Sequence, residues 1–298
     1  MPSKLLYGQV QRSAMNWPFF AAAELNLFAE QNLTVEAKIF TAPPDPVAGL
    51  TGGSLNVINV IPDVALLEMV KGARLSIIAN TNSRPQYRLI ADPEVENCKD
   101  LQGKKIGVND GRSAESLLLK MLLRKNSLAP QAYELVPSGP PLQRCEKLKQ
   151  GLIAATMVTE PFDFLLEEEG FKVLASSIEV APNYPFTVCV VRREEKINDD
   201  ILRFLKCLKK AWQWLCEPAN RDSATSILSR STGTPMKQAQ ATYDLYLQPP
   251  VPPSLAPSEE GVTTVLELLA ESGRLGHPLP PARRFIDGRY FEMLREKK

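Results

Sequence analysis

The chain contains a single histidine, and this scarcity narrows the chemistry that the sequence can support. His277 lies in the segment RLGHPLPP, so residues 1–276 hold no histidine. A Ser–His or Cys–His arrangement would need this one side chain to reach a nucleophile elsewhere. The GxSxG, Walker A and HExxH motifs are also absent. The sequence therefore has no recognisable catalytic set, and we expect no enzyme activity, no metal and no cofactor.

Long apolar runs are missing as well. No segment approaches the roughly 18 apolar residues that a membrane-spanning helix needs. The N-terminal segment MPSKLLYGQVQRS leads directly into a strand-like stretch, without the apolar core or cleavage site of a secretory signal. Either the protein is cytoplasmic, or the sequence is a mature form from which a signal was removed and to which a Met was added.

The cysteines and the charge balance exclude further classes. The number of cysteines is odd and no pair has CxxC spacing, which argues against a zinc site or a disulfide framework; they are Cys98, Cys145, Cys189, Cys207 and Cys216. Cys189 and Cys207 lie in apolar patterns typical of a core. Lys plus Arg (35) nearly equals Asp plus Glu (34), so the net charge of +1 favours neither nucleic acid nor an anionic membrane.

What the sequence does contain is a regular alternation of short apolar strands and amphipathic helices, which predicts mainly parallel α/β sheets. We expect strands near 4–9, 34–40, 56–61, 75–79, 104–108, 134–137, 153–158 and 172–175, with extended segments at 87–91 and 186–192. Helices are expected between these strands, the first running from Pro18 to about Glu30. Beyond residue 198 the pattern is helical, near 199–216, 220–230, 235–246, 260–272 and 284–296, interrupted by the Pro-rich loop QPPVPPSLAPS.

The stretch DLQGKKIGVNDGRSAESLLL, residues 100–119, is the strongest candidate for a ligand-binding element. A strand over 104–108 ends at Asn109, Asp110 and Gly111, and Ser113 is a suitable N-cap for the helix that follows. A sharp turn from strand to helix directs several backbone N–H groups at one spot, together with the positive end of the helix dipole. This geometry suits an anionic or strongly polar small molecule.

Polar residues also follow other predicted strands. Asn16, Asp63 and the segment Asn80–Ser83 all come after strands of the first half of the chain. Ligands of open α/β sheets bind beyond the carboxyl ends of the strands. Such residues also occur in ordinary turns, so the pattern alone leaves both interpretations open.

The order of these segments resembles the type II periplasmic solute-binding proteins, in the NMT1/THI5-like branch that binds sulfonates, nitrate or taurine. The resemblance covers about residues 4–215, and the blocks KDLQGKKIGV and GLIAATMVTEP are specific when taken together. Asn26 stands where the family usually has Gly, and Asn tolerates the left-handed conformation. The other segments that carry the resemblance are FFAAAELNLFAEQNLTVEAKIF, LTGGSLNVINV, VKGARLSIIAN and the remainder of KLKQGLIAATMVTEPFDFLLEEEGFKVLASS.

The resemblance implies a two-lobe α/β fold, each lobe a mixed, mainly parallel sheet flanked by helices, with a helical C-terminal extension. Lobe one would comprise residues 1–87 and 192–298, and lobe two residues 88–191, with crossing strands near 87–91 and 186–192. The ligand would lie in the cleft between the lobes, which would close around it by a hinge motion.

Carried over position by position, the resemblance implies a set of ligand-binding residues. Arg112 could pair with a carboxylate or sulfonate or be a solvent-facing loop residue. Trp17 could stack on a planar ligand or belong to the core. Glu160 could contact the ligand or simply be an acidic residue at a helix start. The full set is Ser13, Asn16, Trp17, Pro62, Asp63, Asn82, Ser83, Gly111, Arg112, Ser113, Thr159, Glu160 and Tyr184.

The resemblance implies the substrate-binding component of an ABC importer, a periplasmic monomer that binds a small organic anion or a planar aromatic or heteroaromatic solute and is recognised by permease subunits. Enzymes share this fold. A pyrimidine synthase is disfavoured because the chain lacks the required active-site histidine and Cys-rich motif, whereas a small decarboxylase or a menaquinone-pathway lyase stays open. A ligand sensor that couples to something other than a permease is a further alternative.

Overall fold

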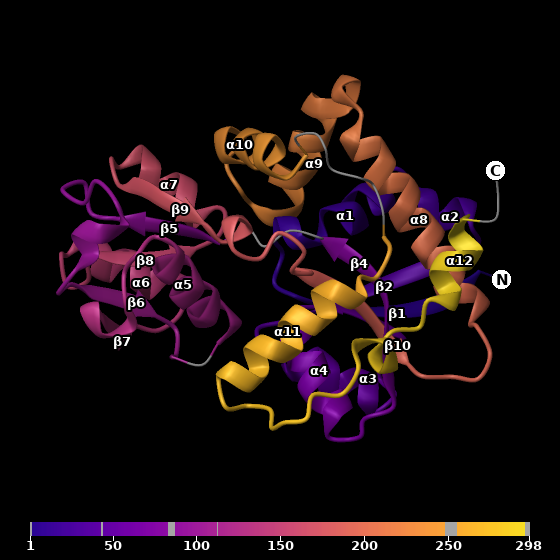
Figure 1. The fold of residues 1–298 in the computed structure, drawn as a ribbon. Helices are drawn as coiled ribbons and strands as arrows, with labels where there is room; N and C mark the ends of the chain where they lie inside the picture. The colour runs from indigo at the N-terminus through magenta and orange to yellow at the C-terminus, as the bar shows by residue number, and fades with distance from the viewer. Residues whose placement is uncertain (1, 43, 83–86, 112, 248–254, 296–298) are drawn as a thin grey trace. The chain divides into compact units, whose positions relative to one another are not determined.

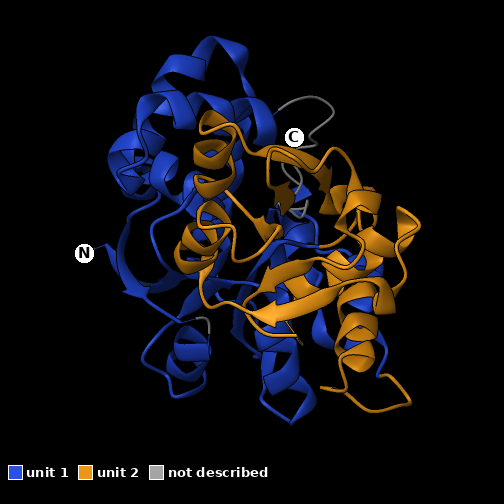
Figure 2. Cartoon of the chain, turned by 90° about the vertical axis from the view of Figure 1, so that its left-hand side faces the viewer, with its two compact units in different colours: residues 1–83, 185–263, 280–298 blue, residues 84–184, 264–279 orange. Residues whose placement is uncertain are grey.

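The computed structural model describes residues 2–42, 44–82, 87–111, 113–247 and 255–295. The chain divides into two compact units (Figure 2): unit 1 comprises residues 1–83, 185–263 and 280–298, and unit 2 comprises residues 84–184 and 264–279. Each unit contains one five-stranded sheet. Of the helices in the described ranges, none is long and apolar enough to cross a membrane.

The sheet of unit 1 is mixed and mainly parallel. Its strand order is β2-β1-β3-β10-β4. β10 runs antiparallel to both of its neighbours, so β1, β2, β3 and β4 all point the same way. Their bounds are β1 Ser3–Val10, β2 Leu33–Phe40, β3 Val57–Val60, β4 Leu75–Asn82 and β10 Thr187–Arg192.

Helices cover both faces of this sheet (Figure 1), with α1, α2 and α8 on one side and α3 and α4 on the other. A stacked ring pair joins α1 to the sheet, with centroids 4.5 Å apart for Tyr7 and Phe19, and a second one joins α2 to α8, with centroids 5.7 Å apart for Phe28 and Phe204. The bounds in unit 1 are α1 Trp17–Glu24, α2 Leu27–Glu30, α3 Pro44–Thr51, α4 Pro62–Val70, α8 Asp199–Cys216, α9 Arg221–Thr232, α10 Met236–Tyr246 and α12 Arg289–Arg295.

The sheet of unit 2 has the order β7-β6-β8-β5-β9, in which β5 alone is antiparallel. Ile90, Leu148 and Leu166 are among the buried residues of its core. The strands are β5 Arg88–Ala91, β6 Lys105–Val108, β7 Glu134–Pro137, β8 Ala155–Val158 and β9 Lys172–Ser176; the helices are α5 Ala114–Lys125, α6 Pro141–Lys149 and α7 Phe162–Glu168. A further helix, α11 Glu259–Glu271, begins in unit 1 and ends in unit 2.

The predicted fold class, mixed and mainly parallel sheets flanked by helices with a helical C-terminal region, is confirmed. Three predicted elements need correction. The helix from Pro18 to Glu30 is interrupted because Asn26 adopts the left-handed conformation, with φ +56°. The C-terminal helix at 284–296 is instead the 3₁₀ helix η6 Ala282–Phe285 followed by α12. The strand at 75–79 continues to Asn82, so the polar residues 80–82 lie in β4 and not in a loop.

Other predictions fall outside the described residues or differ in extent. Residues 264–279, which the sequence prediction placed in lobe one, belong to unit 2. Most of the predicted Pro-rich loop, residues 248–254, lies outside the described residues. All five cysteines are free, and Cys189 and Cys207 are buried as predicted. Burial raises the pKa of each of these two thiols to about 12, so neither is a nucleophile at neutral pH.

Candidate functional site

In unit 1, polar side chains collect at the carboxyl ends of three parallel strands. Gln9 near the end of β1 pairs in register with Asn59 of β3, and Asn59 pairs in turn with Cys189 of β10. Across β10, Thr187 is the register partner of Asn82 at the end of β4. Each of these polar residues is buried. Buried positions in strands are normally apolar, so the polar side chains at this end of the sheet make it a candidate functional site.

Asn59 is the centre of a hydrogen-bond network at this end of the sheet. Its Nδ2 donates to Asn16 Oδ1 at 3.0 Å and to the carbonyl oxygen of Met15 at 3.3 Å, while its Oδ1 accepts from Thr81 Oγ1 at 2.5 Å. Since the Thr81 proton is used in this bond, the hydroxyl of Thr187, 2.8 Å away, donates to Thr81. The network rigidly connects the ends of β3, β4 and β10 with the turn after β1.

Tyr7 of β1 also belongs to this network. Its hydroxyl donates to Asn16 Oδ1 at 2.8 Å. Burial raises the pKa of Tyr7 well above its ordinary value, so the phenol stays protonated and remains a donor. Asn16 Oδ1 thus accepts two hydrogen bonds, from Tyr7 and from Asn59, and these bonds hold the side chain beside the strand ends.

Several acceptors at the same end of unit 1 are left open. Within the described part of the chain, Gln9 Oε1, Ser13 Oγ and Asn80 Oδ1 are buried and have no hydrogen-bond partner. Gln9 is the register partner of Asn59, so its open acceptor is on the same face of the sheet as the network, whereas Asn80 pairs with Val188 and points to the opposite face. Most buried polar atoms in native proteins are hydrogen-bonded, so the open acceptors Gln9 and Ser13 suggest a site for donor groups of another molecule. Pro62 and Asp63, the predicted residues at the start of α4, are also buried.

In unit 2, the predicted strand–turn–helix element is present. Ser113 is the N-cap of α5: its Oγ accepts from the backbone N–H of Ser116 at 3.3 Å. The hydroxyl of Ser116 donates to the carbonyl oxygen of Asp110, and Lys120 Nζ donates to that of Gly111 at 3.1 Å. The turn is therefore held by the helix that it precedes. Arg112 and Ser83 lie outside the described residues, and their ligand roles stay predictions.

The remaining predicted residues of unit 2 follow β8 or precede β10. Thr159 is half-buried, and Glu160 and Tyr184 are buried. α7 begins at Phe162, so Glu160 is not in the first turn of that helix; the backbone N–H of Phe162 donates to the carbonyl of Thr159 at 3.0 Å. The turn after β8 therefore has a fixed backbone, as does the turn after β6.

A buried ion pair joins the elements that carry these two turns. Arg144 of α6 places Nη1 2.9 Å from Glu115 Oε1 and Nη2 3.1 Å from Glu115 Oε2, and its Nη2 also donates to the carbonyl oxygen of Met157 in β8 at 2.9 Å. Arg144 is 1% exposed and Glu115 8%. Burial raises the pKa of Glu115 to about 7, against the opposing effect of Arg144. The pair ties the first turn of α5 to the end of β8.

The comparison with protein families decides the classification. A model of the NMT1-like family matches residues 8–229, which is most of the chain and includes both turns and the residues of the polar network other than Tyr7. The chain belongs to the NMT1-like family.

Curated relatives and solved structures are similar to this NMT1-like chain over most of its length. A candidate binding protein of Brucella abortus (strain 2308) is 23% identical over 214 residues, which are 70% of this chain and 65% of the relative. The match thus spans just under two thirds of that relative's own length.

Two crystal structures show the fold. The ligand-binding component of an ABC-type import system from Staphylococcus aureus, with zinc bound, superimposes with a TM-score of 0.81 at 17% identity, covering 99% of this chain and 100% of the other. The alkanesulfonate-binding protein of Xanthomonas axonopodis pv. citri, bound to MOPS, gives a TM-score of 0.74 at 16% identity, covering 96% and 99%. Both are named as binding proteins, and the NMT1-like chain has their periplasmic-binding-protein fold.

Trp17 does not behave as an open stacking surface in this NMT1-like protein. Its side chain has no exposed area, its Nε1 donates to the carbonyl oxygen of Ala224 at 3.2 Å, and its ring meets Tyr243 edge-on at 6.0 Å. The structure therefore favours the core interpretation over ligand stacking at this position.

Replacing Trp17 by Phe is expected to lower the free energy of unfolding by about 1–3 kcal/mol, because the smaller ring leaves a cavity and the carbonyl of Ala224 loses its donor. Ligand affinity should stay within about twofold of the parent, since the indole is satisfied inside unit 1. Urea denaturation and titration calorimetry measure the two effects, with the half-buried Trp214→Phe as the matched control. A large loss of ligand affinity at an unchanged free energy of unfolding would instead indicate that Trp17 contacts the ligand.

The sequence prediction did not include Gln9, Asn59 and Thr187, nor the pair of Arg144 and Glu115, whereas Thr81 was part of the polar segment Asn80–Ser83 that it singled out. Asn59 gave a signal, because it interrupts the apolar strand segment NVINV. Arg144 and Glu115 gave none, since they are 29 residues apart on two helices. Within the described residues no group of three His, Cys, Asp or Glu side chains is arranged to hold a metal ion.

Proposed function

We propose that this protein is the substrate-binding component of an ABC importer, located in the periplasm, and that it binds a small organic anion or a planar heteroaromatic solute. The carrying observation is the buried network around Asn59 with the open acceptors Gln9 and Ser13 at the same end of the sheet. These groups can bind a polar solute, but they include no nucleophile paired with a base.

The comparisons support the same class. The Xanthomonas protein is named for binding alkanesulfonates, and the Staphylococcus protein is named as the ligand-binding component of an import system. We propose that the network residues of unit 1, and the turns before α5 and after β8 in unit 2, are each suited to contact a polar solute. Backbone N–H groups at the start of α5 suit an acidic group, and the open acceptors in unit 1 suit N–H or O–H groups.

A thermal-shift screen against sulfonates, aromatic carboxylates, pyrimidines and simple anions tests this proposal. A ligand at about 100 times its Kd should stabilise the folded protein by about 2.7 kcal/mol. Recovery of the hit chemically unchanged supports a binding protein, whereas its consumption would show an enzyme. Calorimetry on Arg112→Ala then tests the anion: unchanged affinity for the identified ligand would rule out an Arg112–anion pair.

A further inference from the structure

Unit 1 carries a second polar site, at the opposite end of its sheet from the Asn59 network. Arg74 immediately precedes β4 and Arg193 immediately follows the antiparallel β10, and the backbone N–H of Arg193 donates to the carbonyl of Arg74 at 2.8 Å. The segment after η6 runs beside β4, where Ile286 bridges Ile77. This bridge brings Arg284 of η6 to the same place, although it is far away in the sequence.

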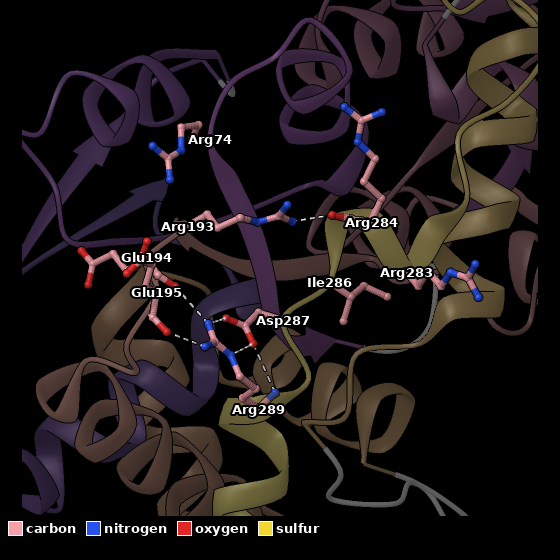
Figure 3. Close-up of a pocket in the computed structure, with 9 residues that line it drawn as sticks. All are labelled: Arg74, Arg193, Glu194, Glu195, Arg283, Arg284, Ile286, Asp287 and Arg289. Carbon is pink, nitrogen blue, oxygen red and sulfur yellow. Dashed lines mark hydrogen bonds and ion pairs between the residues drawn. The ribbon is translucent and has the colours of Figure 1, made fainter.

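Cavities open between these elements (Figure 3). One has a volume of about 460 Å³ and is lined by Arg74, Arg193, Glu194, Glu195, Arg283, Arg284, Ile286, Asp287 and Arg289. An adjoining cavity of about 170 Å³ is lined by Arg74, Arg193 and Arg284 as well. We call these joined spaces the arginine cavity. The larger part is lined mainly by charged residues, with Ile286 as its one apolar residue, whereas the lining of the smaller part also includes the apolar residues Met69, Leu75 and Phe285.

Arg193 is held in position before any ligand arrives. Its Nε donates to the hydroxyl of the buried Ser76 at 2.8 Å, and its Nη2 donates to the carbonyl oxygen of Arg284. Figure 3 shows this side chain extended across the space between Arg74 and Arg284. A guanidinium that is already ordered loses little entropy when it binds an anion.

The charges in the arginine cavity are not balanced. Arg289 is committed to structure: it chelates Asp287 with bonds of 2.8 and 2.7 Å and donates to the carbonyls of Glu194 and Glu195. Among the described residues no carboxylate lies within ion-pair distance of the other four arginines in the lining, Arg74, Arg193, Arg283 and Arg284. Against these four positive charges stand the carboxylates of Glu194 and Glu195, which leaves a local excess of two.

The nearby arginines lower the pKa of the Asp287 carboxyl. Its carboxyl pKa lies below its ordinary value, chiefly because Arg289 hydrogen-bonds it, with a smaller contribution from the charge of Arg193. The chain as a whole has a net charge of only +1, so the positive potential is a property of this place and not of the surface in general.

We propose that the arginine cavity binds a small multivalent anion of the phosphate class. Planar guanidinium forks match the oxygen geometry of phosphate, and the larger space suffices for a phosphate group with a small organic remainder. Because the site is at the far end of the sheet from the Asn59 network, it is separate from the solute site proposed above and does not depend on it.

Titration calorimetry with inorganic pyrophosphate at low ionic strength tests the site. The double variant Arg74→Gln/Arg284→Gln should bind about tenfold more weakly or worse, because two of the cations facing the anion are lost. Arg193 is retained in this variant, since its bonds support the fold. Raising the salt concentration should weaken binding to the parent protein, because the arginines are exposed.

Controls separate the site from general charge effects. Arg124→Gln removes an exposed arginine of α5 in unit 2 and should leave pyrophosphate affinity within about twofold. Asn59→Leu, which alters the proposed solute site, should leave it unchanged as well. Undetectable binding to the parent, equal affinity in the double variant, or an equal loss in Arg124→Gln would each overturn the proposal, whatever the screen for the transported solute finds.

Discussion

Replacing Arg144 by Met is expected to lower the free energy of unfolding by about 3–5 kcal/mol, because it leaves the Glu115 carboxylate buried without its cation. Glu115 is 8% exposed, its Oε2 accepts a hydrogen bond from Arg144 and its Oε1 is within ion-pair distance of the same guanidinium, and the carbonyl of Met157 loses a donor in the same change. Urea denaturation followed by circular dichroism measures the loss. The turns at 110–113 and 159–160 should loosen too, since the pair joins the elements that carry them.

The pH dependence of this variant gives an independent check. The folded-state pKa of Glu115, about 7, is above the ordinary pKa of a glutamate, 4.5, so between these two values the folded state binds more protons than the unfolded state. The contribution of Glu115 to the free energy of unfolding therefore falls as the pH rises from 4.5 to about 7. Removal of Arg144 raises the folded pKa further and extends the window upward. The deficit of Arg144→Met relative to the parent should thus be smaller at pH 5 than at pH 8.

Lys149→Met is the matched control, because Lys149 is on the same helix and also pairs with a glutamate. Its partner Glu169 lies 2.5 Å away, but both side chains are partly exposed, at 31% and 46%. An exposed pair contributes about 0–1 kcal/mol, so this variant should remain near the parent. The double variant Arg144→Met/Glu115→Leu should regain part of the lost stability, since no charge is left buried. If Arg144→Met cost no more than Lys149→Met, the buried pair would not have the role assigned to it.

Replacing Asn59 by Leu is expected to reduce affinity for the transported solute about tenfold to a hundredfold and to lower the free energy of unfolding by about 2–3 kcal/mol. Leucine has a similar size but no hydrogen-bonding group, so Thr81 and the carbonyl of Met15 lose partners inside the buried network. The side chains of the strand ends then lose their fixed positions. Calorimetry with the ligand from the screen and urea denaturation measure the two effects.

Asn56→Ala provides the matched control at the other end of the same strand. Asn56 Oδ1 accepts the backbone N–H of Leu6 at 2.7 Å, so the variant should lose about 1–2 kcal/mol of stability. Because Asn56 is at the amino end of β3, affinity should not change. Equal affinity losses in the two variants would mean that general destabilisation, and not the network, governs binding.

Local signals determined a large part of this structure. Ser113 caps α5 as predicted, because the cap is a bond between residues three apart in the chain. The strands of both sheets likewise follow from short apolar segments. Such features require only neighbours in the sequence, so composition and spacing are enough to place them.

Tertiary pairing decided the rest. The extent of β4 to Asn82 depends on its pairing with β10, which comes more than a hundred residues later and runs between β3 and β4. Trp17 became a core residue because α9 supplies a carbonyl acceptor for its indole. Asn59, the Arg144–Glu115 pair and the arginine cavity likewise depend on partners that only the folded chain brings together.

The sequence by itself thus determined which segments are strands, helices and turns, and the family to which their order points. Only the tertiary structure decided which buried polar atoms are paired and which remain open. The physical reason is that a local conformation depends on one residue and its near neighbours, whereas a buried hydrogen bond or ion pair depends on distances between segments that the sheet order sets.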